Sequence, residues 1–94
     1  MGRSIQYLPR PNLLGALVIK SCAASHDRTA ATGRHREDLA RLYSLVIDPV
    51  GLAQDVREKD QQRLRGAPEP SWEILTDPLT RASAQLAHRR LAGI

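Results

Sequence analysis

The apolar residues between positions 34 and 47 recur with helical spacing, and this pattern constrains the fold more than any other feature of the chain. They fall at positions i, i+3, i+4, i+7 and i+8, namely Leu39, Leu42, Tyr43, Val46 and Ile47. Residues at this spacing share one face of an α-helix, which can then pack against a core. The pattern predicts an amphipathic helix from about Arg34 to Ile47, after a loop over residues 26–33.

An earlier apolar segment predicts a helix that opens at Pro11 or Asn12 and runs to about Ser25. Its apolar positions are Leu13, Leu14, Leu17, Val18 and Ile19, followed by Cys22, Ala23 and Ala24. Because this stripe is wider than a single face, we expect the helix to be buried on more than one side.

The pair Asp48-Pro49 marks a further helix start, since aspartate caps free backbone N–H groups and proline suits the first helical position. It predicts a third helix that ends near Leu64. Within that helix, Asp55 and Lys59 have the i,i+4 spacing of a favourable ion pair.

A second pair, Asp77-Pro78, predicts a last helix that ends near Gly93 by the same reasoning. Before it, residues 66–71 are rich in glycine and proline and predict a loop. Residues 72–75 predict a single turn of helix.

The N-terminal run Ile5 to Leu8 has the character of a strand, and Pro9 and Pro11 end it. A strand needs a sheet to pair with, and no second strand is predicted here. We therefore expect an all-α fold of about four helices in a small bundle, preceded by a short orphan strand or extended segment. Residues 1–10 form the extended segment and residues 11–94 the helical domain.

The core must be built from aliphatic residues, because only 3% of the 94 residues are aromatic and none is phenylalanine. Small chains usually add disulfides or a metal to so thin a core. The single cysteine, Cys22, excludes an internal disulfide and a multi-cysteine zinc site. The chain therefore looks like an incomplete domain, or one that a partner completes.

Charge and hydropathy say less about function. A net charge of +4 permits contact with nucleic acid but is weak support for it, because no run of five like charges occurs. The apolar stretch Leu13 to Ile19 imitates an export signal, but Lys20 charges its end, and it is too short to span a membrane. We expect a cytoplasmic protein without membrane contact, in which Cys22 is reduced and buried.

Few residues are placed for chemistry. His26, His35 and His88 lack the spacing of a metal site, and no Gly-rich phosphate loop, Gly-x-Ser-x-Gly elbow or Asp-x-Asp pair is present. Lys20 lies in an otherwise apolar helix, where a charge needs a partner, and Asp38 lies in the first turn of the next predicted helix. An ion pair between antiparallel helices is one interpretation of these two residues.

A family resemblance offers another interpretation. The run Ile5-Gln6-Tyr7-Leu8-Pro9, Lys20-x-x-Ala23, Arg28 and Arg34-His35-x-x-Asp38-Leu39 resembles the C-terminal half of AbiEii/AbiGii-type nucleotidyltransferase toxins. The resemblance covers most of residues 5–65. His35 stands where that family usually has an aspartate, and the family's upstream Gly-Ser loop and acidic metal pair have no counterpart here.

By this resemblance, Lys20 would face the nucleotide phosphates, Asp38 would orient the Lys20 cation or lie near the metal, and Arg28 would join the nucleotide site. An intact relative would use Mg²⁺, a nucleoside triphosphate and a tRNA-like acceptor. For this chain alone we expect no metal site, no cofactor and no confident catalytic residue, because phosphoryl-type transfer depends on a metal clamp.

Three hypotheses of function follow. The first is a truncated or split nucleotidyltransferase-like protein that retains the helical nucleotide-side half and is inactive alone. Its partner would be a missing N-terminal half, an antitoxin-like protein or a second copy of the chain. The second is a non-enzymatic helical interaction module, such as a homodimer, and the third is a remnant without selected function.

Overall fold

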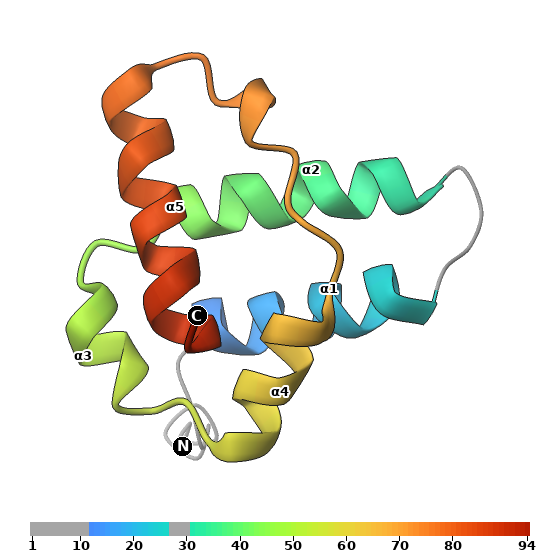
Figure 1. Cartoon of the computed structure of the whole chain (residues 1–94), viewed down its shortest axis with the longest axis vertical. Helices are drawn as coiled ribbons and strands as arrows, with labels where there is room; N and C mark the ends of the chain where they lie inside the picture. The colour runs from blue at the N-terminus through green and yellow to red at the C-terminus, as the bar shows by residue number, and fades with distance from the viewer. Residues whose placement is uncertain (1–11, 27–30) are drawn as a thin grey trace, which may run out of the picture.

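A computed structural model describes residues 12–26 and 31–94, and within them every regular element is helical. Figure 1 shows the elements in chain order: α1 (Asn12–His26), α2 (Ala31–Ser44), α3 (Pro49–Ala53), α4 (Glu58–Gly66), the 3₁₀ turn η2 (Trp72–Ile74) and α5 (Pro78–Ala92). The prediction of a small all-α bundle is confirmed. The predicted strand at residues 5–8 and the extended segment 1–10 lie outside the described residues.

Two layers of helix build the bundle. α1 and α2 lie side by side and run antiparallel, and α5 crosses over them and packs against α2 (Figure 1). α4 packs against both α1 and α5, while α3 contacts α5. None of the described helices is long and apolar enough to span a membrane.

Both Asp-Pro pairs start helices as predicted. Asp48 Oδ1 accepts the Gly51 N–H at 3.1 Å, and Asp77 Oδ2 accepts the Thr80 N–H at 2.8 Å. α5 ends at Gly93, whose φ of 72° lies in the left-handed region that glycine adopts at little cost. These signals involve only neighbouring residues and no tertiary contact, which explains why the sequence alone predicts them.

The predicted continuous third helix is wrong, because α3 ends at Ala53 and α4 begins only at Glu58. Arg57 is extended, with φ −89° and ψ 166°, and its N–H donates to Asp60 Oδ2 at 3.3 Å. Asp60 thus supplies a capping contact at a new helix start. The interruption also separates Asp55 from Lys59, so these residues do not share one helix.

The second predicted helix is displaced toward the N-terminus, since α2 runs from Ala31 to Ser44 rather than from Arg34 to Ile47. Helical geometry is disfavoured at a residue that precedes a proline, here Asp48. Asp48 must also be non-helical to cap α3. Ile47 is consequently 96% exposed and does not join the core, whereas Leu39, Tyr43 and Val46 are buried as predicted.

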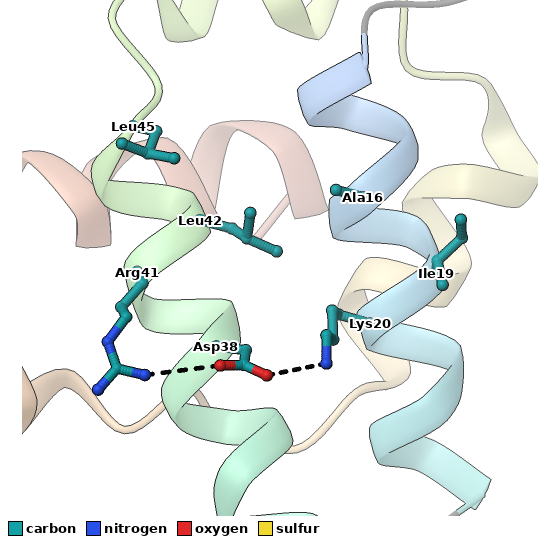
Figure 2. A pocket seen from close by; sticks show the side chains of 7 residues that line it. All are labelled: Ala16, Ile19, Lys20, Asp38, Arg41, Leu42 and Leu45. Carbon is teal, nitrogen blue, oxygen red and sulfur yellow. Dashed lines mark ion pairs between the residues drawn. The ribbon is translucent and has the colours of Figure 1, made fainter.

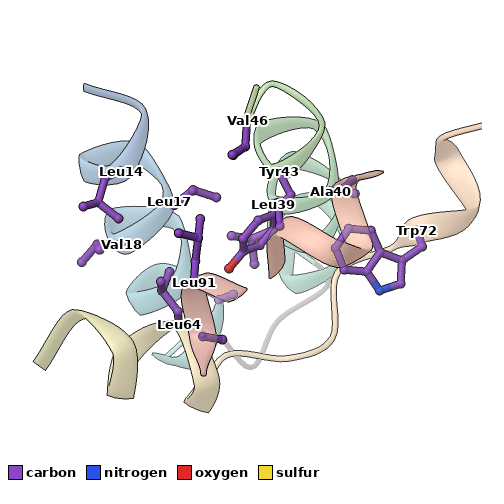
Figure 3. Packing of buried hydrophobic residues seen from close by; sticks show 14 residues of the cluster. Leu14, Leu17, Val18, Leu39, Ala40, Tyr43, Val46, Leu64, Trp72 and Leu91 are labelled. Atoms are coloured by element: carbon purple, nitrogen blue, oxygen red, sulfur yellow. The ribbon is translucent and has the colours of Figure 1, made fainter. Parts of the chain in front are cut away.

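The core is mostly aliphatic, with Tyr43 and Trp72 as its aromatic members, and lies where α1, α2, α4 and α5 meet (Figure 3). Its largest fully buried apolar side chains are Tyr43, Leu14, Leu17, Leu39, Leu64 and Leu91. On α5 the buried positions are mostly small, because Ala84, Ala87 and Ala92 are fully buried beside Leu91. Small side chains let this helix approach α2 closely.

Two aromatic residues of the described chain, Tyr43 and Trp72, lie together with the His88 ring in this core. Tyr43 and Trp72 lie 5.9 Å apart between ring centroids, and the His88 ring meets the edge of Tyr43 at 5.0 Å. The Trp72 indole N–H donates to Glu69 Oε2 at 2.6 Å, which satisfies its polar group near the surface. His88 is therefore a partly buried residue whose ring packs against Tyr43 and Trp72.

Candidate functional site

The clearest polar feature is an ion cluster between α1 and α2. Lys20 Nζ lies 2.8 Å from Asp38 Oδ2, and Arg41 Nη1 lies 3.5 Å from Asp38 Oδ1 (Figure 2). Antiparallel packing brings Lys20, in the third turn of α1, level with Asp38 of α2. We name Lys20, Asp38 and Arg41 the ion cluster.

The electrostatics of the cluster keep Asp38 ionised. The hydrogen bond from Lys20 is the main cause that lowers the pKa of Asp38, and the positive charges of Lys20 and Arg41 act in the same direction. Partial burial opposes them but does not prevail. Because α2 begins at Ala31, Asp38 lies in the middle of the helix and not in its first turn, so the predicted position of Asp38 is wrong.

The Lys20 ammonium is therefore engaged within the protein. Its side chain is 34% exposed and that of Asp38 is 29% exposed, so solvent still reaches both. The neighbouring carboxylate offsets much of the electrostatic attraction that this ammonium would exert on another anion. Any anionic ligand would have to compete with Asp38 for it.

An apolar groove of about 380 Å³ adjoins the ion cluster (Figure 2). α1 contributes Ala16 and Ile19 to its lining, α2 contributes Leu42, and Leu45 lies in the turn just after α2. Two of these are unusually open to solvent, with Ile19 69% and Leu45 61% exposed. We name it the α1–α2 groove; it offers room for apolar side chains and has charged groups at one end.

The structure thus brings together two of the predicted site residues, Lys20 and Asp38. The third, Arg28, lies outside the described residues. The histidines are dispersed, and the described part of the chain holds no group of three or more side chains that could bind a metal. Cys22 is only partly buried beside the core, which corrects the expectation that it is buried.

Sequence reasoning missed the groove and the role of Arg41. The apolar pattern places Ile19 in a wide buried stripe, yet its side chain is 69% exposed. Leu45 falls outside the apolar pattern of Leu39, Leu42, Tyr43 and Val46, and this mismatch is a signal of exposure that the sequence does carry. Arg41 lies three residues after Asp38, a spacing that favours an ion pair on a helix.

Comparisons with protein-family models, with curated proteins and with solved structures find no match for this chain. The resemblance to AbiEii/AbiGii-type nucleotidyltransferases therefore stays a prediction from the residues alone. The geometry of the site has to carry any functional argument.

Proposed function

We propose that the chain is a helical protein-interaction module that associates with a second copy of itself. The observation that carries this proposal is the α1–α2 groove, whose exposed Ile19 and Leu45 flank a hollow with almost entirely apolar walls. Contiguous exposed apolar surface on a small domain usually marks an interaction site. A groove between two helices suits an amphipathic helix of the partner.

The chain itself carries a helix face of the matching kind. On α5, Leu79 is 81% exposed and Leu86 is 48% exposed, with exposed Ala82 between them. These positions have the i, i+3, i+7 spacing of side chains that anchor a helix in a groove. We therefore assign the groove to α5 of a second copy.

The test is sedimentation of full-length chains over a range of concentrations. The wild type should form dimers or larger assemblies, and Leu45→Glu in the groove or Leu86→Glu on α5 should each shift it to monomer. Val50→Glu is the matched control, since Val50 is 53% exposed on α3 but lines neither surface. It should leave association unchanged.

Mixing the two variants distinguishes this interface from others. Leu45→Glu retains an intact α5, and Leu86→Glu retains an intact groove, so an equimolar mixture should recover association through one good contact. A wild type that stays monomeric up to millimolar concentration would refute the proposal. A mixture that stays monomeric would refute the pairing of groove with α5.

A second candidate is the truncated or split nucleotidyltransferase-like protein, which the closeness of Lys20 and Asp38 favours because the resemblance assigns both to one nucleotide site. It predicts weak binding of a nucleoside triphosphate with Mg²⁺, measured by calorimetry, that Lys20→Ala abolishes. The control is Lys59→Ala, which removes an exposed lysine on α4. Equal, negligible binding by wild type and Lys20→Ala would reject this candidate.

A further inference from the structure

A hollow with polar and apolar walls lies between η2 and the C-terminal half of α5, and it shares no residue with the α1–α2 groove. Its volume is about 240 Å³. This is smaller than the ~300–1,000 Å³ of sites for drug-sized molecules, so it suits a ligand of about the size of an amino acid. Its lining comes from the loop before η2, from η2, from α5 and from the residue after the α5 cap, namely Glu69, Trp72, Gln85, His88, Arg89 and Ile94.

The carboxylate of Glu69 is held in place at this hollow. Its Oε2 accepts the Trp72 indole N–H at 2.6 Å, and the backbone carbonyl of Glu69 accepts the Arg36 Nε–H at 2.7 Å. Oε1 has no hydrogen-bond partner among the described residues. A carboxylate fixed in this way keeps one oxygen for a ligand and loses little conformational freedom when the ligand binds.

Arg89 supplies the opposite charge to the same hollow. Its guanidinium is exposed, and within residues 12–26 and 31–94 it makes neither an ion pair nor a hydrogen bond. Glu69 and Arg89 therefore line one cavity without pairing with each other. Because guanidinium groups bind carboxylates and carboxylates bind ammonium groups, this arrangement matches a ligand that carries both charges.

Two further polar side chains line the hollow without a hydrogen-bond partner in the described part of the chain, namely the Gln85 amide and the His88 imidazole. Burial is the main cause that lowers the pKa of His88, so at pH 7 the imidazole is neutral, with one nitrogen that donates and one that accepts. The Trp72 ring packs against this imidazole, with 5.5 Å between ring centroids. Trp72 and Ile94 provide the apolar part of the wall.

We propose that this hollow binds a free α-amino acid with an apolar side chain. Glu69 Oε1 accepts from the ligand ammonium, and the Arg89 guanidinium donates to the ligand carboxylate. The apolar side chain of the ligand lies against Trp72 and Ile94. The inference does not depend on self-association, because neither the α1–α2 groove nor the exposed leucines of α5 line this hollow.

The experiment titrates L-leucine into the full chain at neutral pH and follows the Trp72 indole N–H by ¹H–¹⁵N correlation spectroscopy. Trp72 is the only tryptophan of the chain, so its indole signal is unambiguous, and its hydrogen bond to Glu69 makes it sensitive to a ligand on that carboxylate. Binding should move this signal until it saturates. Two analogues should bind about tenfold more weakly, N-acetyl-L-leucine because it lacks the ammonium and L-leucinamide because it lacks the carboxylate.

Removal of one charge at a time assigns each contact. Glu69→Gln should weaken the binding of L-leucine about tenfold but should not weaken N-acetyl-L-leucine further, because that compound has no ammonium to bind. Glutamine can still accept the Trp72 N–H, so the packing around the indole is kept. Arg89→Gln should act in the same way on L-leucine and L-leucinamide. The matched controls are Glu73→Gln and Arg90→Gln, which remove exposed charges that do not line the hollow and should leave the affinity unchanged.

Two results would overturn the proposal. One is an indole signal that does not move with L-leucine up to about 10 mM, which would show that the hollow has no useful affinity for an amino acid. The other is equal affinity for L-leucine and both analogues, or equal affinity of the wild type and the two charge variants, because the hollow would then not recognise the two charges of the ligand.

Discussion

Breaking the Lys20–Asp38 ion pair should cost a small but measurable part of the free energy of unfolding. At the 2.8 Å separation of Nζ and Oδ2, two unit charges attract by about 1.5 kcal/mol at the dielectric constant of water. Ordering two half-exposed side chains offsets part of this attraction. We expect a coupling free energy of about 0.5–1 kcal/mol.

A double-mutant cycle with Lys20→Met, Asp38→Asn and the double variant measures this coupling by urea denaturation. The cycle is needed because Asp38→Asn also weakens the contact with Arg41, which the coupling term cancels. In 1 M salt, where the screening length falls to about 3 Å, the coupling should shrink markedly.

The contribution of Asp38 to stability should change with pH in one definite direction. The pKa of Asp38 is lower in the folded chain than the unperturbed 3.8. Its contribution to stability is therefore present at pH values above the unfolded pKa and is lost as the pH falls through the folded pKa. A coupling near zero at neutral pH, or one that persists unchanged after Asp38 is protonated, would refute this reasoning.

Three further perturbations test the fold. Asp77→Ala removes the cap of α5 and should lower the unfolding free energy by about 1 kcal/mol, read from the urea midpoint. Asp77→Asn still caps the helix and should keep most of the wild-type unfolding free energy. Leu17→Ala deletes a fully buried side chain and should cost roughly 2–5 kcal/mol, measured by thermal melting; a shift as small as that of an exposed leucine would contradict its place in the core. Burial lowers the pKa of His88, so the chain should lose stability as the pH falls from about 6.5 through that lowered value. The His88→Phe variant should show a weaker decline in urea midpoint between pH 7.5 and pH 5, and an unaltered slope would exclude His88 as its source.

The helices that sequence reasoning placed well are those with local start and stop signals. Asp77 and Gly93 delimit α5 by capping chemistry that involves only neighbouring residues. Apolar spacing also gave the correct buried face of α2, with Leu39 and Tyr43 in the core. Spacing defines a face but not an end, which is why Ile47 was assigned to a helix that stops before it.

What the sequence did not reveal depends on tertiary packing. The break before α4 requires Asp60 to turn back to the Arg57 backbone while being only 2% exposed, and no local pattern predicts that burial. The site was half foreseen, because the need of Lys20 for a partner pointed to Asp38. The adjoining groove was not predicted, because it depends on Ile19 and Leu45 both remaining exposed in the packed bundle.

The run of small residues on the inner side of α5 makes this helix unequally tolerant of change. Ala84, Ala87 and Ala92 have no accessible surface, so nothing can be trimmed from them except a single methyl group. Any larger side chain must push α5 away from its neighbours or force them out of their rotamers. In a population of variants, these positions would accept glycine, serine or cysteine and little else. Leu79 and Ala82, on the outer side of the same helix, would accept many residue types unless a binding partner constrains them. A substitution survey of α5 would therefore record on its inner side the geometry of the core, and on its outer side whether natural selection acts on an interface.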